Sequence, residues 1–139
     1  MEQILDNKGI SRLSDSGNLL VMFDSADKIN CNIDERDVDS YAFLISARRI
    51  IRFHYPFRFE PFPYSGDLRD DLYALIDSGY LHAKSPIRIS RGGKVWVERI
   101  SSASEELKTT IDKAASLLRS MSGWNRKQLF DAIYQEITR

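Results

Sequence analysis

The segment from Phe59 to Ile100 constrains the fold more than any other part of the chain. Its first residues alternate between apolar and charged, which predicts a short strand. A proline-rich turn and an amphipathic helix over residues 65–79 follow. Four apolar residues are spaced to give this helix one buried face: Leu68, Leu72, Leu75 and Ile76. Ser65 is a favourable N-cap and Gly79 a favourable C-terminal stop, so this is the best-defined helix that the sequence predicts.

Two short strands are predicted after this helix, over residues 80–89 and 95–99, because apolar and polar residues alternate in both. Between them, the sequence Arg91-Gly92-Gly93-Lys94 predicts a tight hairpin turn, since glycine accepts positive φ. A helix followed directly by a hairpin is the core of a winged helix. We therefore expect an α+β fold over residues 15–100, with a winged-helix-like core of helices plus a small antiparallel β-hairpin.

Two further helices are predicted earlier in the chain. The first covers residues 18–23 with Asp15 or Ser16 as its N-cap, and residues 1–14 before it are expected to form a frayed tail or a short helix. The second spans residues 34–52 and is apolar on most faces. Such a helix is expected to lie centrally in the core.

A pair of amphipathic helices is predicted at the C-terminal end. The first begins at a capping box in which Ser102 is the cap and Glu105 lies three residues on. The pair forms a helical extension, residues 101–139, of the single domain that we expect for residues 1–139. It can pack against the core, or it can supply the seam of a homodimer.

The net charge of the 139-residue chain is zero, but the charges are unevenly placed. Acids outnumber bases in residues 1–40, and bases outnumber acids in residues 41–60 and 81–100. A neutral chain lacks the excess of positive charge typical of a broad nucleic-acid binder. The two basic stretches still permit a narrower contact with nucleic acid.

The first residues of the chain include acids and no long apolar run, so we expect no signal peptide. No segment reaches the roughly 20 apolar residues that a membrane span needs. We therefore expect a cytoplasmic protein without a membrane partner. Cys31 is the only cysteine, which excludes an intramolecular disulfide and a cysteine-based zinc site.

Residue patterns of familiar catalytic sites are missing from the sequence. His54 and His82 are the only histidines, and no set of His, Asp and Glu has the spacing of metal ligands. No serine lies in a nucleophile elbow, and residues 91–94 lack the pattern of a phosphate-binding loop. We therefore expect neither an enzyme nor a cofactor.

The basic stretches supply the candidates for nucleic-acid binding. In a winged helix the tip of the hairpin meets the phosphate backbone, and Arg91 and Lys94 are expected at that tip. An ordinary solvated turn is the alternative. The full candidate set is Arg48, Arg49, Arg52, Lys84, Arg88, Arg91 and Lys94.

The aromatic residues between 53 and 64, together with the helix over residues 65–79, supply the candidates for protein binding. The rings can form a peptide groove, stack on single-stranded nucleic acid or fill the core. The outward face of the helix is expected to be acidic, with Asp67, Arg69, Asp70 and Asp77. A helix that reads the major groove should instead offer Arg, Lys, Asn or Gln. The candidate set for a protein partner is Tyr55, Phe57, Phe62, Tyr64 and Arg69.

Two motifs resemble those of a known family. Pro63-Tyr64-Ser65 matches the end of a Tyr-Gly-Pro-Tyr-Ser turn, although Pro61 and Phe62 replace its first two residues, and Leu75 to Leu81 matches the end of the helix that follows. On these motifs, residues 18–100 resemble the YwgA-like proteins and, more distantly, the Panacea (SocA-like) antitoxin domain. The Panacea resemblance implies neutralisation of a partner toxin, and neither resemblance implies catalytic residues.

Two functions follow as expectations. The first is a non-enzymatic module for protein–protein interaction, antitoxin-like or adaptor-like, which the acidic helix face and the zero net charge favour. The alternative is a dimeric DNA-binding transcriptional regulator, which the basic hairpin favours.

Overall fold

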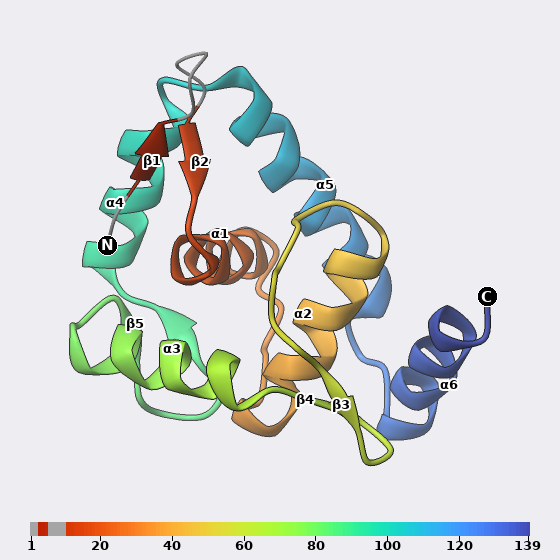
Figure 1. The fold of residues 1–139 in the computed structure, drawn as a ribbon. Helices are drawn as coiled ribbons and strands as arrows, with labels where there is room; N and C mark the ends of the chain where they lie inside the picture. Colours follow the sequence, from red (N-terminus) through yellow and green to blue (C-terminus); the bar gives the residue numbers. More distant parts are fainter. Residues whose placement is uncertain (1–2, 6–10) are drawn as a thin grey trace.

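The computed structural model describes the backbone of residues 3–5 and 11–139 and the side chains from residue 13 onward. The fold is α+β (Figure 1), as expected from the sequence. The helices are α1 (Asp15–Lys28), α2 (Val38–Ala47), α3 (Gly66–Asp77), α4 (Arg91–Ser101), α5 (Glu105–Met121) and α6 (Arg126–Ile137), and a 3-10 turn, η1 (Glu35–Asp37), precedes α2. The strands form three antiparallel pairs: β1 (Gln3–Leu5) with β2 (Ser11–Leu13), β3 (Arg58–Phe59) with β4 (Pro63–Tyr64), and β5 (Leu81–His82) with β6 (Arg88–Ile89).

The first of these strand pairs replaces the tail or short helix that we predicted for residues 1–14. This prediction is wrong for residues 3–5 and 11–13, which pair as strands β1 and β2. For residues 1–2 and 6–10 it lies outside the described part of the chain. The physical reason is pairing: two weakly patterned segments satisfy their backbone groups through each other rather than within a helix.

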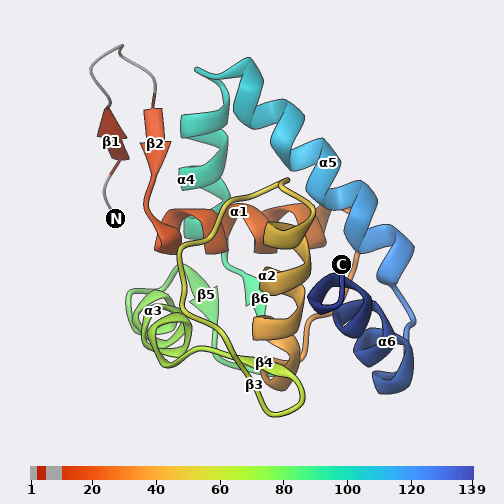
Figure 2. The same ribbon diagram turned by 45° about the vertical axis from the view of Figure 1, so that its right-hand side comes forward.

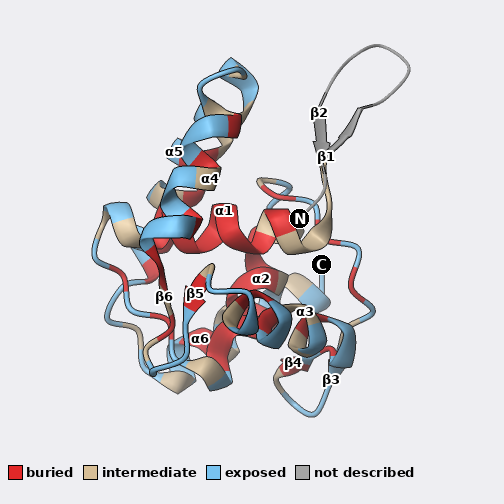
Figure 3. Ribbon diagram, turned by 90° about the vertical axis from the view of Figure 1, so that its left-hand side faces the viewer, coloured by how far each residue is buried: buried red, intermediate tan, exposed pale blue. Residues whose placement is uncertain are grey.

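Helix α1 is the centre of the hydrophobic core. Every residue from Leu19 to Ala26 is buried (Figure 3), and α1 contacts α3, α4, α5 and β6. The helix is longer than predicted, and its N-cap is Ser14, whose Oγ accepts a hydrogen bond from Gly17 N–H at 3.2 Å. The predicted cap Asp15 instead accepts a hydrogen bond from His54 N–H at 3.1 Å, which ties α1 to the segment after α2.

Helix α2 is also central, but it is shorter than the helix predicted over residues 34–52. Asp34 makes no side-chain cap, the η1 turn comes first, and α2 ends at Ala47. The chain then reverses because Arg49 adopts a positive φ of 60°, and Ile50 N–H donates to the carbonyl of Ile45. The apolar residues after this reversal reach the core through an extended segment rather than through a helix.

Helix α3 agrees with the prediction at both ends. Ser65 Oγ accepts a hydrogen bond from Leu68 N–H at 3.3 Å, and Gly79 follows the helix with a φ of +83°, a conformation that favours glycine. The predicted leucine positions of the stripe are buried, with Leu68 and Leu72 fully inaccessible. The stripe therefore identifies the face of α3 that packs on α1.

The basic hairpin predicted at residues 91–94 is wrong. The hairpin after α3 is the short pair β5–β6, and residues 91–101 form helix α4. Ser90 starts this helix: its Oγ accepts a hydrogen bond from Gly93 N–H at 3.1 Å and donates one to the carbonyl of Gly79 at 2.6 Å. Arg91 and Lys94 therefore lie in the first turn of a helix and not at the tip of a wing.

The C-terminal helical pair is confirmed, and both helices pack within the chain. Helix α5 packs across α1, and α6 lies beside α2 (Figure 2). The cap of α5 is Ser104 rather than the predicted Ser102, because Ser104 Oγ accepts a hydrogen bond from Leu107 N–H at 3.1 Å. The predicted seam of α5 is buried at Ile111, Ala114, Leu118 and Met121. Its apolar face is thus covered by its own chain and offers no free seam for a second copy.

Candidate protein-binding surface

Three of the seven basic candidates are engaged by carboxylates. Arg88 Nη2 and Lys94 Nζ lie 2.6 Å and 2.7 Å from the two oxygens of Asp27, and Arg48 Nε lies 2.8 Å from Glu136. The other four candidates are exposed, and they lie after α2, in the β5–β6 loop and at the start of α4: Arg49, Arg52, Lys84 and Arg91. Ion pairing reduces the positive charge that the basic stretches can offer to a phosphate backbone.

We expect the Asp27 pairs to stabilise the fold in a pH-dependent way. Burial raises the pKa of Asp27, but hydrogen bonds from Lys94 and Arg88 outweigh it and lower the pKa below its ordinary value of 3.8. Their contribution is therefore fully present above pH 3.8 and is lost as the pH falls through the lowered pKa. Asp27→Asn should cost about 1 kcal/mol at pH 7, since both cations are partly exposed.

Urea denaturation of wild type and Asp27→Asn at pH 7 and pH 3 checks this. The difference in unfolding free energy should shrink at pH 3. A difference that grows on acidification would contradict the assignment.

Two of the five candidates for a protein partner are used inside the fold. Tyr55 is buried, and its hydroxyl donates to Asp71 Oδ2 at 2.6 Å, while burial and this bond raise its pKa. Arg69 points inward, contrary to the expectation of an outward position, and its Nη2 lies 2.5 Å from Asp39 Oδ1. These two residues hold α3 in place and present little surface.

The outer face of α3 is acidic, as predicted. Asp67, Asp70 and Asp77 are exposed, together with Tyr73, and Arg69, the only base of this helix, is turned away from that face. Figure 3 shows the outer side of α3 in pale blue. A helix with this face repels a phosphate backbone.

The candidates Phe57 and Phe62 belong to two clusters of rings that we together call the aromatic surface. It consists of Phe43, Phe57, Phe59, Phe62, Phe130 and Tyr134. The Phe43 ring lies 5.7 Å from the Phe57 ring and 5.1 Å from the Phe59 ring. The Phe62 ring lies 5.8 Å from that of Phe130, which stacks on Tyr134 at 6.3 Å. Phe59 is 41% exposed and Tyr134 57% exposed, so each cluster reaches the surface of the molecule.

The β3–β4 hairpin joins the two halves of the aromatic surface. Its tight turn is closed by a hydrogen bond from Glu60 N–H to the carbonyl of Phe62 at 3.1 Å, and the hairpin carries Phe59 of one cluster and Phe62 of the other. The guanidinium of Arg126 lies 4.1 Å from the centre of the Phe62 ring and also pairs with Asp37. The hairpin packs against α2 through β4, and its Phe62 contacts Phe130 of α6 (Figure 2).

The candidate Tyr64 lies beside the aromatic surface and is exposed, with the guanidinium of Arg58 5.7 Å from its ring. Sequence reasoning did not include Phe130 and Tyr134, which α6 contributes. The available signal was their spacing of four residues next to the buried stripe of Leu129 and Ile133. Leu129 and Ile133 already supply the buried face of α6, so the two aromatic residues beside them indicate a second apolar contact.

Comparisons of the chain with protein-family models, curated proteins and solved structures found no match. The resemblance to the YwgA-like and Panacea families thus stays a prediction. Among the described residues there is no cluster of three or more His, Cys, Asp or Glu that could hold a metal ion. In the same part of the chain, none of the helices combines the length and apolar character required to cross a bilayer.

Proposed function

We propose that this protein is a non-enzymatic binding module that docks a partner protein on the aromatic surface. The observation that carries the proposal is the exposure of Phe59 and Tyr134, one in each of the two ring clusters that the β3–β4 hairpin links along the chain. Contiguous apolar surface is uncommon on a monomer without a partner, and aromatic residues are enriched at the centres of interfaces. The partner supplies apolar or aromatic side chains that cover these rings.

The order of the elements supports a winged-helix-like core for this module. Helix α3 is followed directly by the short β5–β6 hairpin, and α1 lies in the centre of the core. An antitoxin-like or adaptor-like role is the form of protein binding that the resemblance to the Panacea domain suggests. In that role the module recognises its partner without catalysis.

The charges favour a protein partner over DNA. The outer face of α3 is acidic, and Arg48, Arg88 and Lys94 are paired with carboxylates. The chain as a whole carries no net charge. Phosphate contacts dominate affinity for DNA, so these features give little electrostatic attraction for the DNA that a transcriptional regulator would bind.

Substitution at the aromatic surface tests the proposal. A partner is first captured with the wild-type chain from cells that express it and is then purified for calorimetry. Tyr134→Ser and Phe59→Ser should each weaken its binding at least tenfold, because each removes an exposed ring from the surface. Tyr73→Ser is the matched control: Tyr73 is 45% exposed on α3, away from the aromatic surface, and its loss should leave affinity unchanged.

Equal binding by wild type, Tyr134→Ser and Phe59→Ser would overturn the proposal. Sedimentation of the purified chain separates a different partner from a second copy: a homodimer that Tyr134→Ser dissociates would contradict the adaptor role. Titration with duplex DNA of mixed sequence at low and moderate salt tests the alternative. Tight, salt-sensitive binding would favour the regulator.

A further inference from the structure

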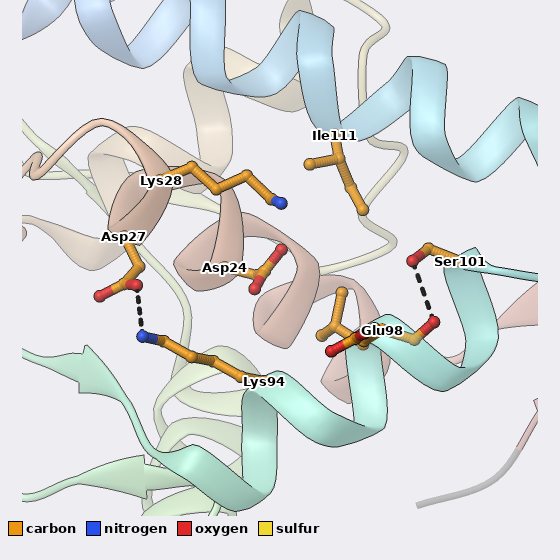
Figure 4. A pocket seen from close by; sticks show the side chains of 8 residues that line it. Asp24, Asp27, Lys28, Lys94, Glu98, Ser101 and Ile111 are labelled. Atoms are coloured by element: carbon orange, nitrogen blue, oxygen red, sulfur yellow. Dashed lines mark hydrogen bonds and ion pairs between the residues drawn. The ribbon is translucent and has the colours of Figure 1, made fainter.

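A pocket of about 430 Å³ lies between the C-terminal half of α1, helix α4 and the first half of α5. Figure 4 shows its lining, which is independent of the aromatic surface. The charged residues are Asp24, Asp27, Lys28, Lys94 and Glu98, and the remainder are Val97, Ser101 and Ile111. A volume of this size accommodates a small organic molecule.

Asp24 is the unusual residue of this pocket. Its side chain lines the pocket although the residue is only 8% exposed. Within the part of the chain that the structure describes, its carboxylate has no hydrogen-bond or ion-pair partner. Burial raises the pKa of Asp24, and the charge of Lys28 only partly opposes this effect. A carboxylate of a mostly buried residue is poorly solvated, so a ligand that brings a hydrogen-bonding cation to Asp24 gains more than at a fully exposed acid.

Lys28 offers the complementary charge one helical turn further along α1. Its ammonium group is turned toward the same space as Asp24 (Figure 4), and it forms no ion pair with a described residue. The other lysine of the pocket, Lys94, is already engaged by Asp27 at 2.7 Å. Among the described residues, the pocket therefore holds one cation, Lys28, and two carboxylates, Asp24 and Glu98, that have no ion-pair partner at contact distance.

The rest of the lining completes the chemistry of a small ligand. Val97 and Ile111 are buried and form apolar walls, while Glu98 adds an exposed carboxylate from α4 to those of Asp24 and Asp27. A ligand with only a positive charge would be repelled by Lys28. A ligand with only a negative charge would be repelled by Asp24 and Glu98. Only a molecule that carries both charges meets an opposite charge at each end.

We propose that this pocket binds a small zwitterion of the α-amino-acid class with an apolar side chain. Its ammonium group is held by Asp24, its carboxylate by Lys28, and its side chain lies against Val97 and Ile111. Binding neutralises Asp24 without exposing it and leaves the pair between Asp27 and Lys94 intact. The site gives the protein a ligand in addition to the partner protein, and it does not depend on the proposed function.

Calorimetric titration of the full chain with L-leucine, L-isoleucine, L-valine and L-methionine tests the proposal. At least one should bind saturably. For the leucine skeleton, 3-methylbutylamine lacks the carboxylate and 4-methylpentanoate lacks the ammonium group, so each should bind at least tenfold more weakly than L-leucine. Saturable binding by none of the four amino acids, or equal binding of the amine and its amino acid, would overturn the proposal.

Variants then locate the site. Asp24→Asn and Lys28→Gln should each weaken amino-acid binding at least tenfold. Asp131→Asn removes an exposed carboxylate from α6, outside the pocket, and should leave affinity unchanged. Unaltered affinity in Asp24→Asn would contradict the assignment.

The folding of Asp24→Asn is itself predictable. Because burial raises the pKa of Asp24, the charged form opposes folding at neutral pH, and stability is gained as the pH falls through the raised pKa. The ligand-free variant should therefore melt at or above the wild-type temperature at pH 7. If Asp24→Asn melts at or above the wild-type temperature and does not bind the amino acid, the loss of binding is due to the missing carboxylate and not to unfolding.

Discussion

Replacing Gly93 by alanine is expected to destabilise the protein by about 3 kcal/mol, at the upper end of the usual cost of overpacking a core. A Cβ at this position would lie 2.5 Å from the carbonyl oxygen of Tyr80 and 2.6 Å from Cγ1 of Ile89. The Tyr80 oxygen cannot retreat easily, because it accepts a hydrogen bond from Ser90 N–H at 3.0 Å. The first turn of α4 can thus approach β6 only if residue 93 has no side chain.

Gly92→Ala is the matched control for this prediction. A Cβ at residue 92 would come no closer than 3.7 Å to any atom, and alanine favours a helix over glycine by up to about 1 kcal/mol. Urea denaturation should therefore show Gly93→Ala strongly destabilised and Gly92→Ala unchanged or stabilised. If residues 91–94 were a hairpin turn with positive φ at both glycines, both variants would be destabilised, and that result would contradict helix α4.

The failure of the hairpin prediction has a local and a tertiary cause. Alternation of Val95 and Val97 with polar residues predicts a strand, but the buried positions of the helix, Gly93, Val97 and Ile100, also fit a period near 3.6. Paired glycines favour a turn when the sequence is read alone. Helix α4 forms because Ser90 caps it and because Gly93 allows its first turn to approach the carbonyl of Tyr80. The approach to Tyr80 is a tertiary contact that no local sequence pattern shows.

Helix α3 shows the opposite case. Its cap, its leucine stripe and its terminal glycine all agree, so propensity, periodicity and turn chemistry predict the same element. Where only one of these signals is present, as at the end of α2, the boundary is wrong. The reversal at Arg49 depends on a residue with no preference for positive φ.

The candidate site was predictable only in part, because two distant segments build it. Phe57 and Phe62 lie in a stretch whose aromatic content is plain in the sequence. Phe130 and Tyr134 join them because α6 packs on α2, and that contact is tertiary. Tyr55 was selected for the same aromatic content, but its hydroxyl meets Asp71 inside the fold.

Asp39→Asn is expected to destabilise the protein by about 3 kcal/mol, the usual cost of breaking a buried ion pair by removing one charge. Asp39 is 1% exposed and joins α2 to the start of α3. Its Oδ2 accepts a hydrogen bond from Ser65 N–H at 2.9 Å, and its Oδ1 lies 2.5 Å from Arg69. Asparagine can still accept the bond from Ser65, so the loss comes from the uncompensated charge of Arg69.

A double variant separates that charge from the hydrogen bond. Asp39→Asn combined with Arg69→Met should recover most of the lost stability in urea denaturation, since no buried charge then remains unpaired. Asp70→Asn, an exposed acid on the same helix, should change stability by no more than about 0.5 kcal/mol. If the double variant were as unstable as Asp39→Asn alone, the ion pair would not be the cause. Because Ser65 directly follows β4, loosening of this joint should also weaken partner binding at the aromatic surface, and the double variant should restore it.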